Sequence, residues 1–172
     1  MKLLKLVPTF LLLFGFFPFT NIAHADLEDP KNYKVLSSSN KKLSIANVQE
    51  YITEGDNLIE KGDFEKAKET YDKARNLAKQ LSGFYRDLNK SFRGLDARIP
   101  VEMDNKGRKS IKIWAESNSR LASLYIRKKQ SEVAVPLLIE IIRLMSPTST
   151  EGKKAYASLI ELGFVETPFR GS

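Results

Sequence analysis

The chain has 172 residues, of which 42% are hydrophobic and 28% are charged, so it can bury the core of about one domain. It carries 28 Lys and Arg against 21 Asp and Glu, a formal net charge of +7, with one His and no Cys. Disulfide bonds, a Cys nucleophile and a Cys-ligated metal site are therefore excluded.

The first 25 residues have the order of a secretory signal peptide. Lys2 and Lys5 form a short basic start, residues 6–19 are an apolar run, and residues 23–25 read Ala-His-Ala, a small-residue cleavage pattern. The alternative is an uncleaved membrane anchor, although the run is shorter than the ~20 residues that a spanning helix needs. We expect an exported protein whose mature chain begins at Asp26.

Cleavage of the signal peptide would also remove the single histidine of the chain. His24 lies in the predicted signal peptide, so the mature chain would lack both His and Cys, which excludes a Ser-His-Asp triad and a His-ligated metal site. We predict no catalytic residue, no metal site and no cofactor. The mature chain keeps 26 basic against 21 acidic residues, and residues 86–129 hold 12 of the basic but only 5 of the acidic ones.

Two helices are predicted after a flexible leader over residues 26–43, which has no sustained apolar period. Ser44 is a suitable N-cap, and apolar residues recur behind it at helical spacing to about Lys61. Asp63 is a suitable N-cap for a second helix, whose apolar residues fall on one face from Phe64 onward. A tight turn would join the two helices into an antiparallel hairpin.

This hairpin resembles a tetratricopeptide repeat, the 34-residue helix–turn–helix unit. The resemblance is carried by Gly55, Leu58, Gly62, Asp63, Phe64, Ala67, Tyr71 and Ala74, whereas Glu54 departs from the Leu usual in the family. Gly55 and Ala67 are expected where the two helices approach closely. Tyr71 is expected to fill the space between units.

A second copy of the pattern lies 67 residues further along, close to twice the repeat length. Its matching residues are Ala122, Tyr125, Ala134, Leu138 and Ile141, with residues 129–131 at the turn. Pro136 lies about one turn inside the second helix of this copy. There it should bend the helix or move its start toward Val133.

The 34-residue register fails between the two copies. Residues 84–95 still mark a helical face, which Gly94 and Pro100 then break. Residues 97–108 read as a loop, and a long helix is predicted over about residues 109–128. We therefore expect a degenerate or inserted segment between two repeat units.

A last helix is predicted to close the stack. Thr148 and Glu151 suggest a capping box, the helix is expected over residues 150–162, and Gly163 should stop it. Such a helix would cover the apolar face of the last unit, and residues 166–172 would form a tail. The prediction is an all-α, TPR-like stack of antiparallel helical hairpins over residues 44–165.

The resemblance implies a binding groove. Repeats of this family hold peptides or helices of other proteins against the first helix of each unit. The implied groove residues are Gln49, Ile52, Asp56, Ile59, Glu60, Glu116, Ser119, Ser123, Ile126 and Arg127. The alternative for each is an ordinary solvated or core position. Ile52 and Asp56 replace the Lys and Asn with which some family members grip a C-terminal carboxylate, so that clamp is not predicted.

A second candidate surface is the basic middle segment. Its residues are Arg86, Lys90, Arg93, Arg98, Lys106, Arg108, Lys109 and Lys112. We expect them to meet an acidic surface of a partner protein or anionic lipid headgroups, and the alternative is a solvated charged face. No nucleic-acid partner is expected, because an exported protein rarely meets nucleic acid.

Two smaller features are a single tryptophan and a nearby acidic pair. Trp114, the only tryptophan, is expected to pack in the core rather than to anchor a partner. Glu102 and Asp104 are the one nearby acidic pair that could serve a carboxylate-dependent hydrolase.

The sequence thus predicts a non-enzymatic scaffold or assembly factor that binds another protein. A structural subunit of a membrane-associated complex and a carboxylate-dependent hydrolase are the alternatives. A helical-repeat domain that follows a signal peptide and lacks Cys is similar to exported and thylakoid-lumenal repeat proteins of cyanobacteria. That likeness implies the periplasm or the thylakoid lumen, with peripheral membrane contact as a further expectation.

Overall fold

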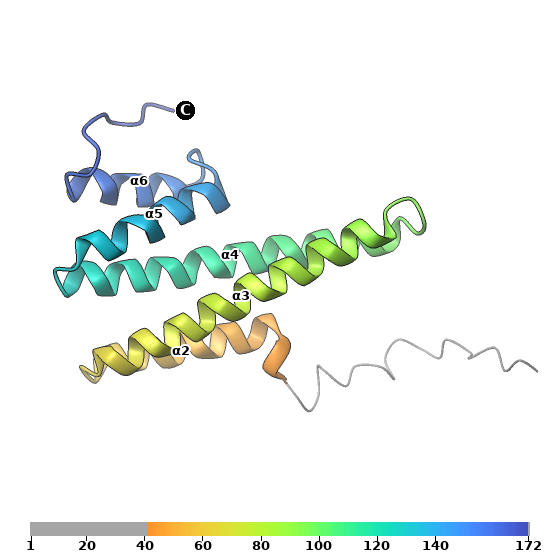
Figure 1. The fold of residues 1–172 in the computed structure, drawn as a ribbon, viewed down its shortest axis with the longest axis horizontal. Helices are drawn as coiled ribbons and strands as arrows, with labels where there is room; N and C mark the ends of the chain where they lie inside the picture. Colours follow the sequence, from red (N-terminus) through yellow and green to blue (C-terminus); the bar gives the residue numbers. More distant parts are fainter. Residues whose placement is uncertain (1–40, 172) are drawn as a thin grey trace, which may run out of the picture. The chain divides into compact units, whose positions relative to one another are not determined.

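The computed structural model describes residues 41–171. The predicted signal peptide and most of the predicted leader lie outside the described residues. Within them the chain forms a short 3-10 turn, η2, and α-helices α2 to α6, and no strand (Figure 1). The elements are η2 (Lys41–Leu43), α2 (Ile45–Glu60), α3 (Phe64–Phe92), α4 (Arg98–Arg127), α5 (Ser131–Met145) and α6 (Thr150–Glu161). The predicted all-α stack is confirmed.

Each α-helix packs against the next one along the chain, and α2 also contacts α4 (Figure 1). The apolar core follows this order. One buried cluster joins α2, α3 and α4 around Val48, Ile52 and Ala78, and another joins α4, α5 and α6 around Ala122 and Leu138. None of these helices is both long enough and apolar enough to cross a membrane.

Two of the three predicted N-caps are correct. The Ser44 side chain accepts a hydrogen bond from the backbone N–H of Asn47 at 3.1 Å, and Asp63 accepts one from the N–H of Lys66 at 3.2 Å. At α6 the prediction of Thr148 is wrong. The cap is Ser149, whose hydroxyl accepts a hydrogen bond from the N–H of Gly152 at 2.9 Å. Thr148 and Ser149 are adjacent and both carry a hydroxyl suited to capping, and the second of them is the cap.

The two predicted hairpins turn in the same way. In the first, the N–H of Gly62 donates to the Ile59 carbonyl at 3.1 Å, and Gly62 has a φ of 78°. In the second, the N–H of Lys129 donates to the Ile126 carbonyl at 2.9 Å, with a φ of 59° at Lys129. The left-handed turn is therefore repeated 67 residues apart although only one of the two residues is glycine.

The expected loop over residues 97–108 is wrong, because α4 already begins at Arg98. Pro100 falls in the first helical turn, where no backbone N–H is needed for an intrahelical bond. Just before the helix, the Asp96 carboxylate accepts a hydrogen bond from the N–H of Arg98 at 3.0 Å. Ion pairs from Glu102 to Lys106 and from Asp104 to Arg108 then connect successive turns.

The expected inserted segment is consequently not a separate element. It consists of the end of α3 and the beginning of α4, which are antiparallel to each other and joined by the turn at residues 93–97. Both helices extend beyond α2 and α5 (Figure 1). We call residues 84–111 the arm. The two hairpins that share the 67-residue pattern are therefore neighbours in the stack.

Two features of the C-terminal part differ from expectation. Helix α5 begins at Ser131 and continues through Pro136, so the second of the two effects expected of this proline, a shift of the helix start toward Val133, does not occur. Gly163 ends α6 as predicted, with a φ of 69°. The expected tail is held against α6, because the Tyr156 hydroxyl donates to the Thr167 carbonyl at 2.7 Å and the Tyr156 ring meets that of Phe169.

Candidate functional site

A groove crosses α2, α4 and α6. Its first part is a hollow of about 180 Å³ between α2 and α4, bordered by Asp56, Ile59 and Arg127. Its second part is a hollow of about 240 Å³ between α4 and α6, with residues of α5 at its base. Arg120 and Ser123 border both hollows, so the two parts form one continuous surface.

Seven of the ten predicted groove residues line these hollows. They are Asp56, Ile59, Glu116, Ser119, Ser123, Ile126 and Arg127. Ile52 does not, because it is 1% exposed and packs in the core beside Val48. Gln49 lies on the outer face of α2, away from the groove, and Glu60 is exposed but borders neither hollow.

The centre of the groove holds a network of fixed charges. Arg120 Nε donates to Asp56 Oδ1 at 2.9 Å, and the Tyr71 hydroxyl donates to the same oxygen at 2.6 Å. Burial by itself would lower the pKa of Arg120, but the hydrogen bond and charge of Asp56 outweigh it, and the pKa is raised. Burial, aided by Asp56, also raises the pKa of Tyr71. Arg120 is therefore cationic and Tyr71 neutral at physiological pH.

The Asp56–Arg120 pair is accessible to a ligand. Both side chains are 40% exposed, so solvent screens the pair and its net contribution to stability is small. The apolar side chains of Ile59 and Ile126 lie in the two hollows that meet at this pair.

Sequence reasoning missed a polar network that joins α3, α4 and α5. Arg75 Nε donates to Asn118 Oδ1 at 2.7 Å, and both Arg75 and Asn118 donate to Glu140 Oε2, at 2.7 and 2.8 Å. Asn118 is fully buried. A signal existed, because Asn118 follows Trp114 by four residues and precedes Leu121 by three, which places a polar side chain in an apolar stripe.

This network fits a structural role. Burial alone would raise the pKa of Glu140, but the hydrogen bonds from Arg75 and Asn118 outweigh it and hold the pKa below the ordinary value of 4.5. Each of the three side chains is paired with the other two. A partly buried charge pair that also bonds a fully buried Asn favours one register of the helices that carry these side chains.

The eight predicted basic residues do not form one patch. Arg86, Lys90 and Arg93 border a hollow of about 360 Å³ on one face of the arm, with Arg108 opposite them. Lys112 lines the groove instead, and Lys109 is exposed outside both. Arg98 and Lys106 are paired with Asp96 and Glu102. Hydrogen bonds from Arg98 lower the pKa of Asp96 to about 2.

Trp114 is half-buried at the edge of the core and lines the arm hollow. Its indole Nε1 is buried and has no hydrogen-bond partner among the described residues. The ammonium of Lys79 lies 5.7 Å from the ring centroid, a cation–π contact. The expectation of a packing role therefore holds for part of the ring only.

The acidic pair considered for catalysis does not converge. Glu102 and Asp104 are two positions apart on α4, which turns their side chains about 200° from each other. Each is exposed and engaged in its own ion pair. Among residues 41–171 there is no group of three or more His, Cys, Asp or Glu side chains arranged to hold a metal ion.

No protein-family model, curated protein or solved structure matches this chain. Its function is therefore inferred from the surfaces described above.

Proposed function

We propose that the protein is a non-enzymatic scaffold or assembly factor that binds a segment of another protein in the groove over α2, α4 and α6. The observation that carries the proposal is the continuity of the groove. Two hollows share Arg120 and Ser123, and seven residues named from the sequence line them.

The proposal includes a tetratricopeptide-like organisation of the stack. It is supported by the repeated left-handed turns at Gly62 and Lys129 and by the small residues at matching offsets. Ala67 and Ala134, which are 67 residues apart, are both fully buried between helices. In such a stack the first helices of successive hairpins line the binding surface, and α2, α4 and α6 hold those positions here.

The chemistry of the groove favours a segment that combines apolar side chains with charges of both signs, because Glu116 and Glu151 lie among its cations. Ile59 and Ile126 offer apolar contacts in its two parts. Arg120 is already paired with Asp56, which leaves Arg127 at one end and Lys112 and Lys154 at the other to attract carboxylates. Charge complementarity of this kind sets orientation and the rate of encounter more than raw affinity.

The compartment is part of the proposal and rests on the sequence. An N-terminal segment with signal-peptide order supports export to a periplasm or a thylakoid lumen. A structural subunit of a membrane-associated complex remains the second candidate. The hydrolase is not favoured, because Glu102 and Asp104 point apart and are already paired.

A single groove substitution tests the proposal. Ser123 is exposed and borders both hollows, so Ser123→Arg should block the groove without disturbing the core. Asn76→Arg, on an exposed position of α3, is the matched control. A partner is first captured by the tagged wild-type protein and then purified. It should bind the wild-type protein directly, bind Ser123→Arg at least tenfold more weakly, and bind Asn76→Arg with unchanged affinity.

Equal binding of the partner to both variants would overturn the proposal. The same capture separates the two candidate roles. Several substoichiometric complexes indicate an assembly factor, whereas one complex of fixed stoichiometry indicates a structural subunit.

A further inference from the structure

The arm carries a second surface that the groove does not use. We propose that the arm binds the surface of an anionic bilayer, with the apolar tip in the membrane interface and a row of cations on the lipid phosphates. This inference is independent of the proposed groove function.

The tip of the arm exposes large apolar side chains. Leu95 is 79% exposed in the turn and Val101 is 62% exposed in the first turn of α4, more than any other large apolar side chain among the described residues. Phe84 and Leu88 are also exposed along α3. Isolated exposed apolar residues are common on soluble proteins, but a group at the end of a projecting hairpin marks an interaction surface.

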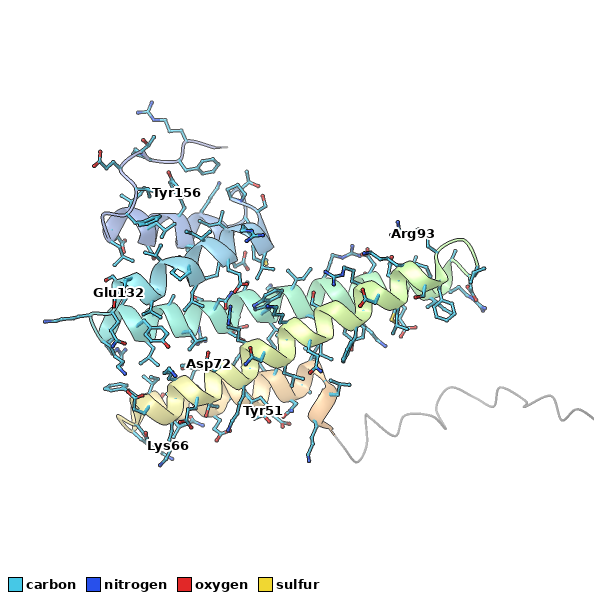
Figure 2. All side chains as sticks on the ribbon, in the orientation of Figure 1. Tyr51, Lys66, Asp72, Arg93, Glu132 and Tyr156 are labelled. Atoms are coloured by element: carbon cyan, nitrogen blue, oxygen red, sulfur yellow. The ribbon has the colours of Figure 1, made fainter. Side chains whose placement is uncertain are left out.

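The cations form a row directly behind this tip. Arg86, Lys90 and Arg93 follow at intervals of four and three, which places them on one flank of α3. Figure 2 shows Arg93 close to the turn between α3 and α4. Since a helix rises about 1.5 Å per residue, the row extends roughly 10 Å from Arg93 toward the body of the protein.

The charges of this row are available to a ligand. The Lys90 ammonium makes no hydrogen bond or ion pair with another described residue. Arg93 donates to the neutral side chain of Asn89 at 3.0 Å, and the contact of Arg86 with Asp87 is long, at 3.6 Å between exposed side chains. Of the other arm cations, Arg98, Lys106 and Arg108 are each paired with a carboxylate, and Lys109 is exposed outside the row.

The order of these groups along the arm favours a bilayer over an acidic protein. An interfacial element places apolar side chains at the acyl boundary and Lys or Arg at the level of the phosphates. The arm has the same order of groups, with Leu95 at its tip and the cations from Arg93 back to Arg86 behind it. A flat acidic protein surface would pair with the cations but would leave Leu95 and Val101 in water.

Vesicle binding tests the proposal. The chain from Asp26 onward is suitable, because it keeps every residue of the described helices and omits the apolar run at residues 6–19, which would bind lipid by itself. Its sedimentation would be compared with vesicles of phosphatidylcholine alone and of phosphatidylcholine mixed with phosphatidylglycerol. Trp114, which lines the arm hollow, provides a fluorescence signal from the same surface.

Two sets of variants locate the contact. The triple change Arg86→Glu, Lys90→Glu and Arg93→Glu should weaken binding to the anionic vesicles about a hundredfold, since each basic residue near the surface contributes roughly a fivefold factor. The control Lys61→Glu, Lys73→Glu and Lys153→Glu changes net charge equally at exposed positions outside the arm and should retain most of the binding. Leu95→Ser with Val101→Ser should weaken binding while leaving its salt dependence intact.

The proposal is overturned if the protein binds both kinds of vesicle equally, or neither. It is also overturned if the arm and control variants lose binding to the same extent. Capture of an acidic protein by the arm without any vesicle binding would likewise overturn the proposal and would indicate a protein partner for the arm. All substituted residues are exposed, and circular dichroism of each variant confirms that it is folded.

Discussion

The ring of Tyr71 in α3 lies directly against the α-carbon of Gly55 in α2. A Cβ at residue 55 would come 2.3 Å from Tyr71 Cε1, closer than any real contact of this kind. Tyr71 is only 2% exposed, so the ring cannot move aside into solvent. Its hydroxyl also binds Asp56 at 2.6 Å, so the same contact that sets the approach of α2 to α3 positions a carboxylate in the groove.

Gly55→Ala should therefore destabilise the protein. Overpacking costs about 1–3 kcal/mol, which exceeds the gain of up to ~1 kcal/mol from replacing a glycine in a helix. The control is Gly83→Ala in α3, where a Cβ would meet nothing within 4 Å, and it should stabilise. Urea unfolding monitored by the fluorescence of Trp114 measures the free energy of unfolding of both variants. A Gly55→Ala protein as stable as Gly83→Ala would refute this account.

Introducing a glycine at one hairpin turn and removing the glycine from the other should change the free energy of unfolding in opposite directions. Lys129 holds a left-handed conformation with a φ of 59°, so Lys129→Gly should raise the free energy of unfolding by about 0.5–1 kcal/mol. Gly62→Ala, at a φ of 78°, should lower it by about 1 kcal/mol. Thermal unfolding of the two variants gives the signs, and a shift in the same direction for both would contradict the equivalence of the turns.

The contact of α6 with the preceding loop depends on Gly152. A Cβ there would lie 2.0 Å from the Ser146 carbonyl oxygen, which belongs to the backbone and cannot rotate away. Gly152→Ala should therefore loosen α6 and remove the Ser149 cap, which by itself contributes about 1 kcal/mol. Hydrogen exchange should speed up in α6 and remain slow in α2 and α3. Uniform acceleration throughout the helices would argue against a local effect.

The Arg75–Asn118–Glu140 network predicts acid sensitivity. Its hydrogen bonds hold the pKa of folded Glu140 below 4.5, its ordinary value. A lowered pKa contributes stability that is present above the unfolded value and is lost as the pH falls through the folded one. Glu140→Gln should cost about 1–3 kcal/mol at pH 7 and should flatten the decline of stability below about pH 4.5.

The control for this experiment is Glu69→Gln, on an exposed position of α3. It should leave the unfolding free energy at pH 7 within about 0.5 kcal/mol of the wild type. If Glu140→Gln kept the full acid dependence of the wild type, the network would not be its source.

Local features of the sequence determined much of the fold. The caps at Ser44 and Asp63, the stop at Gly163 and the helical faces were predicted correctly, because each depends on residues within about one turn. The close approach at Gly55 was also predicted, since only a residue without a side chain fits beneath a buried ring.

Tertiary structure decided the rest. Gly94 breaks the helix as predicted, since α3 ends at Phe92 and Gly94 has a φ of 86°. Pro100 also read as a breaker, yet a proline in the first turn of a helix disrupts nothing, and only the position of Asp96 and the packing of α4 on α3 fix where that turn begins. Ile52 was assigned to the groove but turns into the core.

The sequence by itself thus determined most of the helices and their hairpins, and seven of the ten residues that it named for a groove line the two hollows. It did not reveal the bonds of Arg75 to Asn118 and Glu140, which join residues 43 and 65 positions apart, or that the basic middle segment forms a projecting arm. The physical reason is the same in both cases. Periodicity reports which face of a helix is apolar, whereas the partner that covers this face, or leaves it uncovered, is chosen only when distant helices pack together.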